Sequence, residues 1–216
     1  MSWLESWLQE PGDLARAFLV VLGSYFIGCV AGGYYLVRWT TGRDIRFVGS
    51  GSAGARNVSS VLGIRGFLVT LVWDALKGAL AVWVAARCTG DSRMEGLAMV
   101  AALAGHLWPA QLGFRGGKGV ATSLGSLLMF EPELLLALAL LFLPPWILLR
   151  RTILPGMVAY ACLPFAAWFL DHGGYRSGVV AVCSMLVLYA HRRNLAEEWA
   201  ALSARRRPPA MNSEKA

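Results

Sequence analysis

The chain has 216 residues, of which 56% are hydrophobic and 15% are charged, and its mean hydropathy is +0.53. A soluble domain would carry about 25% charged residues. The apolar residues here form long runs, so the composition excludes a soluble globular domain and predicts an integral membrane protein. The four cysteines lack the spacing of a metal site or a disulfide framework and are interpreted as packing residues.

Seven apolar runs predict an all-α fold with seven transmembrane helices. The runs cover residues 15–37, 66–86, 94–112, a short stretch ending at 130, 134–149, 153–170 and 178–190. The fourth run is short and is expected to tilt or to span only part of the bilayer. We expect residues 1–210 to form a single membrane domain and residues 211–216 to be a disordered tail.

The basic residues set the orientation, because Lys and Arg accumulate on the cytoplasmic side. With seven spans, fifteen of the twenty Lys and Arg residues fall on one side, and that side includes the C-terminus. The N-terminus is therefore expected outside and the C-terminus in the cytoplasm. The acidic residues near the start argue against a cleaved signal peptide.

The glycine turn, residues 105–122, contains three glycines around one lysine. These residues are Gly116, Gly117, Lys118 and Gly119. Glycine lets backbone N–H groups face an anion, and the lysine adds a full positive charge. Thr122 is expected near the positive end of the following helix. The turn predicts a phosphate site; the alternative is a tight membrane loop with a lysine marking the cytoplasmic side. It does not match a Walker loop, so ATP is not implied.

A second glycine-rich segment, residues 49–57, follows the first apolar run. Its candidate ligand-binding residues are Ser50, Gly51, Ser52, Gly54, Arg56 and Asn57. The segment formally matches G-x-G-x-x-G, but that pattern requires a preceding strand, so a dinucleotide fold is not indicated. We interpret it as a flexible loop rich in hydrogen-bond donors; the alternative is an ordinary polar connection between two spans.

The last apolar run ends in His191-Arg192-Arg193-Asn194. A basic cluster often ends a helix on the inside of the membrane, but that role needs neither His nor Asn. His191 is expected to donate a hydrogen bond to a phosphate or a developing oxyanion, and Asn194 to share its helix face if the helix continues. Arg192 is a further candidate for phosphate binding.

Asp74 and Lys77 lie three residues apart within the second run. Charged residues at that depth are costly, at about 2.5–3.5 kcal/mol each, and they usually pair or line a polar cavity. We favour a mutual ion pair that locks helices together over a cavity-lining role. The candidate segments contain no carboxylate cluster, so neither a metal nor a cofactor is expected, and nothing indicates nucleic acid or an obligate protein partner.

Taken together, these segments resemble the bacterial membrane glycerol-3-phosphate acyltransferases that use acyl phosphate, the PlsY family. The similarity is carried by residues 49–57, by His106, Pro109 and Phe114 through Thr122, and by the His191–Asn194 cluster. Asp74, Lys77 and Gly78 match a further family pattern, and the similarity covers nearly the whole chain. The chain departs from the family at Ser52, Arg56, Ser60 and Arg193, and the family's Gly-x-Glu ending is not evident.

The resemblance implies acyl transfer from a fatty acyl phosphate to the 1-hydroxyl of glycerol 3-phosphate, giving lysophosphatidate for phospholipid synthesis. It implies catalytic roles for Lys118, His191 and Asn194, and substrate binding by the first segment, by His106 and by the glycine turn. The site would face the cytoplasm at the bacterial inner membrane. The alternatives are an acyltransferase with another phosphorylated acceptor or a thioester donor, and an organic-phosphate carrier. The carrier is disfavoured because no internal repeat is visible.

Overall fold

The computed structural model describes residues 12–171 and 174–205, and all regular elements within these ranges are helical. The α-helices are α1 (Asp13–Cys29), α2 (Gly32–Thr41), α3 (Ala55–Thr89), α4 (Ser92–Leu107), α5 (Val120–Phe130), α6 (Glu133–Leu149), α7 (Ile153–Asp171), α8 (Tyr175–Ala190) and α9 (Arg192–Arg205). Two short 3₁₀ turns, Ile45–Phe47 and Ala110–Leu112, lie in the connections. Each of the seven apolar runs is therefore largely helical, although the first run is divided between α1 and α2 and the third run continues past the end of α4.

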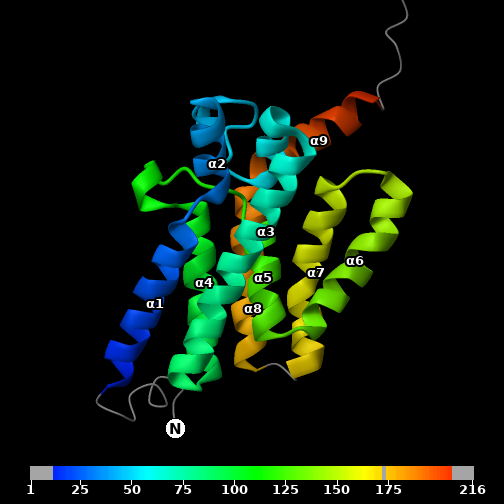
Figure 1. Cartoon of the computed structure of the whole chain (residues 1–216). Coiled ribbons are helices and arrows are strands. Elements are labelled where there is room, and N and C mark those ends of the chain that lie inside the picture. Colours follow the sequence, from blue (N-terminus) through cyan, green and yellow to red (C-terminus); the bar gives the residue numbers. More distant parts are fainter. Residues whose placement is uncertain (1–11, 172–173, 206–216) are drawn as a thin grey trace, which may run out of the picture.

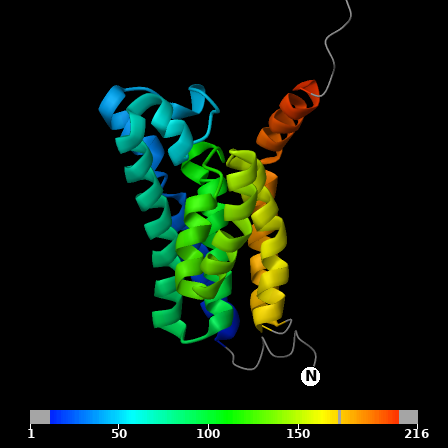
Figure 2. The same cartoon turned by 90° about the vertical axis from the view of Figure 1, so that its right-hand side faces the viewer.

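Three helical stretches have the length and composition needed to cross a membrane: Asp13–Thr41, Ala55–Thr89 and Ile153–Leu170. Three shorter apolar helices are Val120–Phe130, Glu133–Leu149 and Tyr175–Ala190. The predicted all-helical class is confirmed for the described residues. Figures 1 and 2 show α2, the loop that follows it and α9 at one end of the bundle, and the start of α1 at the other.

Two helices differ from the runs that predicted them. The first run is broken, because Val30 and Ala31 leave the helical conformation between α1 and α2. The second run lies on a helix that starts in the polar segment, at Ala55, and continues through a kink at Gly63 with φ 64°. Residues 55–57 therefore begin a helix and are not part of a flexible loop.

Glycines allow the helices to approach closely in two places. A Cβ on Gly28 of α1 would lie 2.1 Å from the carbonyl oxygen of Ala102 in α4, and one on Gly125 of α5 would lie 1.8 Å from that of Ala75 in α3. Small residues are the usual means of close packing in lipid, where helices gain little from burying apolar surface. These two contacts bring α4 and α5, which flank the glycine turn, against α1 and α3.

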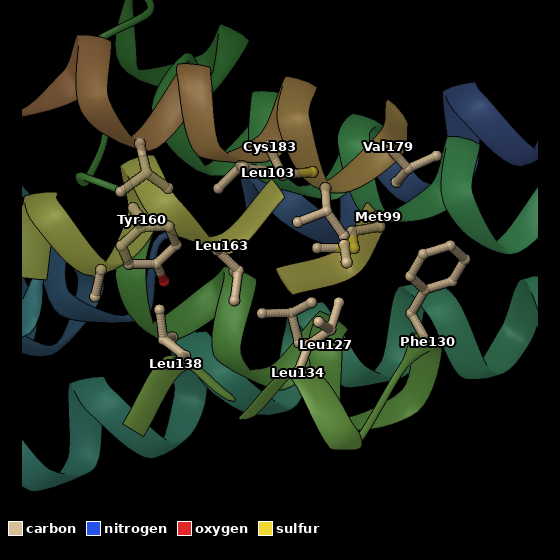
Figure 3. Close-up of a cluster of buried hydrophobic side chains, with 14 of the residues drawn as sticks. Met99, Leu103, Leu127, Phe130, Leu134, Leu138, Tyr160, Leu163, Val179 and Cys183 are labelled. Atoms are coloured by element: carbon tan, nitrogen blue, oxygen red, sulfur yellow. The ribbon is translucent and has the colours of Figure 1, made fainter. Parts of the chain in front are cut away.

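A hydrophobic core fills the space between α4, α5, α6, α7 and α8 (Figure 3). Met99, Leu103, Leu127, Leu134 and Leu163 are almost fully buried there. The core supports the inner face of α5 and α7, which both contribute to the cavity described next.

Candidate active site

The three glycine-rich or basic segments meet at one end of the bundle. Ala53 donates a backbone hydrogen bond to the carbonyl of Gly116 at 3.1 Å, which joins the first segment to the glycine turn. Arg46 strengthens that junction by donating from Nη1 to the Leu112 carbonyl at 2.7 Å. Lys118 of the turn donates to the side-chain oxygen of Asn194 at the start of α9. The expectation that distant segments come together is confirmed.

A cavity of about 1050 Å³ opens where these segments meet. Its polar end is lined by Ser50, Ser52, Arg56, Lys118, His191, Asn194 and Glu197. It continues into an apolar groove lined by Phe67, Leu71, Leu124, Leu138, Phe142, Met157 and Tyr160. The groove lies between α3 and α5 on one side and the α6–α7 pair on the other, so one cavity offers both a polar and an apolar compartment.

The first segment is organised by Asn57, whose side chain is buried. Its Oδ1 accepts a hydrogen bond from the backbone of Ser50 at 3.0 Å, and its Nδ2 lies 2.9–3.2 Å from the carbonyls of Ile45, Val48 and Ser52. Asn57 lines the cavity, but its polar atoms are used to shape the loop. The sequence-based expectation that this side chain binds a ligand needs correction, because these contacts leave it little capacity to do so.

Other residues of that segment divide between the cavity and the loop itself. Ser50, Ser52, Gly54 and Arg56 line the cavity, whereas Gly51 lies outside it. The backbone of Gly51 has φ 71°, a left-handed conformation that suits glycine. Gly51 is therefore a turn residue and not a ligand-binding one.

Two backbone N–H groups of the glycine turn, expected to bind phosphate, donate to carbonyl groups of the chain instead. Gly116 donates its N–H to the Leu107 carbonyl and Gly117 donates to the His106 carbonyl, both at 3.0 Å. Neither glycine lines the cavity. The predicted phosphate-binding role of these two amides is therefore corrected: they fold the turn back onto the end of α4.

The residues just after these two glycines face the cavity. Gly119, with φ 87°, precedes the first residue of α5, and both Gly119 and Val120 line the cavity. The first N–H groups of a helix lack intrahelical acceptors and favour anions. Thr122 is fully buried and lies outside the cavity, with its carbonyl oxygen 2.1 Å from the position of a Cβ on Gly78. It packs α5 on α3, contrary to its predicted place in the phosphate site.

Lys118 is the central cation of the polar end. Desolvation by partial burial lowers the pKa of its ammonium group, and the positive charge of Arg56 lowers it further. Arg56 reaches across the cavity from α3, with its Nη1 3.5 Å from the Thr152 hydroxyl just before α7. Two cations that repel each other across a cavity form an attractive site for an anion bound between them.

His191 occupies the junction between α8 and α9. Its Nδ1 lies 2.9 Å from the Val187 carbonyl, so Nδ1 carries the hydrogen and the neutral ring presents Nε2 as an acceptor. Burial lowers the pKa of His191, as do the charges of Lys118 and Arg56. The expected hydrogen bond from His191 to a phosphate stays a prediction for the protonated ring, whereas the neutral ring offers Nε2 as an acceptor.

Arg192 and Asn194 have different positions although they are close in sequence. The helix does not continue through the cluster: α8 ends at Ala190 and α9 starts at Arg192. Arg192 is exposed, and its guanidinium lies 4.0 Å from the centre of the Tyr189 ring and donates to the Tyr189 carbonyl. It lies outside the cavity, contrary to expectation, whereas Asn194 lines it.

His106 lines the inner part of the cavity together with Asp74. Sequence reasoning missed Ser60, Thr152 and Glu197 as cavity-lining residues, and it named none of the residues that line the apolar groove. Glu197 follows Asn194 at helical spacing, and this spacing could have indicated that Glu197 lines the cavity.

In residues 12–171 and 174–205, no three His, Cys, Asp or Glu side chains are grouped so as to hold a metal ion.

Comparison with known proteins places the chain in a family. A sequence model of the family described as "Glycerol-3-phosphate acyltransferase" matches residues 18–201. The chain belongs to this family. The glycerol-3-phosphate acyltransferase 1 of Desulfitobacterium hafniense (strain Y51) is 42% identical over 188 residues, which cover 87% of this chain and 93% of that protein. The corresponding enzyme of Synechococcus sp. (strain CC9902) is 41% identical over 184 residues, covering 84% and 90%.

The glycerol-3-phosphate acyltransferase family also includes solved relatives. The glycerol 3-phosphate form of PlsY (YgiH), an integral membrane glycerol 3-phosphate acyltransferase, superposes with a TM-score of 0.77 at 29% identity, covering 86% of this chain and 92% of that one. Its lysophosphatidic acid form gives a TM-score of 0.73 at 28% identity, with the same coverage. The resemblance inferred from the sequence is confirmed: the chain is an acyltransferase of the integral membrane type.

Proposed function

We propose that the enzyme transfers a fatty acyl group from an acyl phosphate to the 1-hydroxyl of glycerol 3-phosphate, giving lysophosphatidate and inorganic phosphate. The observation that supports this most is the single cavity with a cationic polar end and an apolar groove. Such a cavity suits a phosphorylated headgroup and a fatty chain together. The two related PlsY structures, a glycerol 3-phosphate form and a lysophosphatidic acid form, support the same acceptor and product.

The chemistry needs little from the protein beyond position and charge, because an acyl phosphate is already activated. The acceptor oxygen attacks the acyl carbonyl carbon, the bond from that carbon to the phosphate oxygen breaks, and phosphate leaves with the hydroxyl proton. Lys118 and the first amides of α5 would stabilise the leaving phosphate. Asn194 accepts a hydrogen bond from Lys118 and thereby directs the ammonium group.

His191 would orient the attacking hydroxyl group. Its free Nε2 can accept the hydroxyl hydrogen, which turns an oxygen lone pair toward the acyl carbon. Because the proton leaves with the phosphate, the imidazole ring orients the hydroxyl group and is not an obligatory base. Arg56, Ser50 and Ser52 would hold the phosphate and hydroxyls of glycerol 3-phosphate at the opposite wall.

The membrane topology completes the proposal. Seven helices would cross the bilayer, with the N-terminus outside and the polar end of the cavity at the cytoplasmic face of the bacterial inner membrane. The excess of Lys and Arg at that end supports this orientation. The acyl chain would then lie between α3, α5, α6 and α7, within the hydrocarbon layer.

The test is a lysophosphatidate assay on purified enzyme with palmitoyl phosphate and glycerol 3-phosphate. Lys118→Ala should lower kcat by about 100- to 1000-fold, as expected for loss of a charge-stabilising donor. Arg115→Ala is the matched control, because Arg115 is an exposed cation in the same turn that does not line the cavity. Its kcat should stay within about 3-fold of the wild type.

Three further arms separate the alternatives. Palmitoyl-CoA in place of palmitoyl phosphate tests a thioester donor, and a panel of phosphorylated polyols tests the acceptor. Addition of a chelator should leave the rate unchanged. Absence of lysophosphatidate with acyl phosphate, or full activity of Lys118→Ala, would overturn the proposal.

A further inference from the structure

Three ionisable side chains form a buried cluster beneath the glycine turn. Asp74 and Lys77 on α3 and His106 at the end of α4 are only 2%, 5% and 5% exposed. Lys77 Nζ lies 3.0 Å from Asp74 Oδ1, and His106 Nδ1 lies 3.5 Å from the same oxygen. The ion pair expected from the sequence is present, but it has a third member. Burying such groups is costly, so a cluster like this commonly marks a functional element of a membrane protein.

The cluster is anchored to the break in the first run. Lys77 donates from Nζ to the Val30 carbonyl at 3.1 Å. Val30 lies where α1 ends, so its carbonyl is available to an outside donor. Asp74 is thus held from one side by a lysine that is itself fixed to a neighbouring helix.

The other side of the cluster contacts the glycine turn directly. The carbonyl of His106 accepts the N–H of Gly117, and a Cβ on Gly117 would lie 2.0 Å from His106 Nε2. The imidazole therefore packs against the backbone of the residue immediately before Lys118. A tilt of the ring or a shift of the turn would move the ammonium group that contacts Asn194.

We infer that Asp74 and His106 are positioning residues for the reaction: they fix the glycine turn so that Lys118 meets the substrate phosphate. The inference rests on the proposed function, because it assigns Lys118 to that phosphate. Asp74 acts on the imidazole through charge, because its carboxylate lies 3.5 Å from Nδ1 without forming a hydrogen bond, and the Nε2 end of the ring packs against Gly117. If the cluster were only an ion pair that locks α3 in place, the contact between His106 and the glycine turn would have no effect on the reaction.

Charge-balanced variants distinguish the two roles. Removing Asp74 alone would leave a buried, uncompensated Lys77, which strongly destabilises a protein, whereas replacing both partners by apolar residues is often neutral. The double variant Asp74→Leu with Lys77→Met should therefore melt within a few degrees of the wild type. Its kcat should nevertheless fall about 100-fold, the effect expected from a displacement of about 1 Å near the reacting groups.

Two more variants complete the design. His106→Leu keeps the ion pair and should lose kcat to the same extent. The triple variant that adds His106→Leu to the double variant should be no worse than the double, because residues that act as one unit are not additive. As a readout besides activity, inorganic phosphate should raise the melting temperature of the wild type and of Arg115→Ala, but much less that of the double variant.

The outcomes are separable. Wild-type kcat and a wild-type phosphate-induced shift in the double variant would overturn the positioning role. If the double variant does not fold, His106→Leu decides: wild-type kcat and phosphate shift there overturn the inference, and their loss supports it. If the wild type makes no lysophosphatidate but its phosphate shift disappears in His106→Leu, the proposed function fails while the positioning role stands.

Discussion

Gly156 offers the sharpest test of the acyl groove. It lines the cavity on α7, about one helical turn beyond Thr152 at the polar end, and a Cβ added there meets no atom within 4 Å. Leucine at this position would fill space that the fatty chain should occupy. Displacing about four methylenes at about 0.8 kcal/mol each costs about 3 kcal/mol, or about 150-fold in kcat/KM for palmitoyl phosphate.

The assay compares two donors on the Gly156→Leu enzyme. Acetyl phosphate has no chain to reach Gly156, so its kcat/KM should remain within about 3-fold of the wild type. Gly156→Ala is the control; it should keep both activities and gain about 0.5–1 kcal/mol of stability from the helix interior. Equal losses for both donors, or no loss for palmitoyl phosphate, would refute the assignment of the groove to the acyl chain.

Three other variants test separate parts of the structure. His191→Ala should lower kcat about 100-fold without abolishing turnover, and the wild-type rate should fall only as the pH drops through the lowered pKa of His191. Arg46→Ala should cost about 1–3 kcal/mol of stability, seen in thermal melts, because it loses its bond to a carbonyl in the glycine turn. Gly125→Ala should destabilise by about 1–3 kcal/mol or more, since its Cβ would lie 1.8 Å from the Ala75 oxygen, whereas Gly23→Ala, which meets no atom within 4 Å, should not.

Each of these has a contradicting result. Complete loss of turnover with intact phosphate binding in His191→Ala would make that residue an obligatory base. If activity is still lost at acidic pH in His191→Gln, the pH dependence arises from a group other than His191. Equal melting temperatures for Gly125→Ala and Gly23→Ala would show that α3 and α5 can separate at little cost.

The sequence was sufficient to predict which segments meet. Apolar runs determine helices, and the basic residues indicate which connections share a side, so Lys118 and Asn194 were expected near each other. The atoms that face the cavity were not predictable, because residue type does not reveal which partner uses a polar group. Asn57 and Gly117 bear suitable groups for a ligand, but nearby carbonyls take their hydrogens.

The residues that line the apolar groove were missed for a different reason. Helices such as α6 are apolar all round, so their sequence does not distinguish a face toward lipid from a face toward a cavity. Leu138 lines the groove and Leu140 is exposed, yet both have the same side chain. Their difference arises only when α6 packs against α7.

The interruption at Val30 constrains how this protein can change over time. The carbonyl released there accepts Lys77, and it also accepts the indole N–H of Trp73 at 3.3 Å. A substitution that restored a continuous first helix would withdraw that acceptor and leave the buried ammonium group of Lys77 with Asp74 but without its carbonyl partner on α1. Relatives in which the first helix is uninterrupted are therefore expected to lack the lysine as well, so the two features should be inherited or lost as a pair.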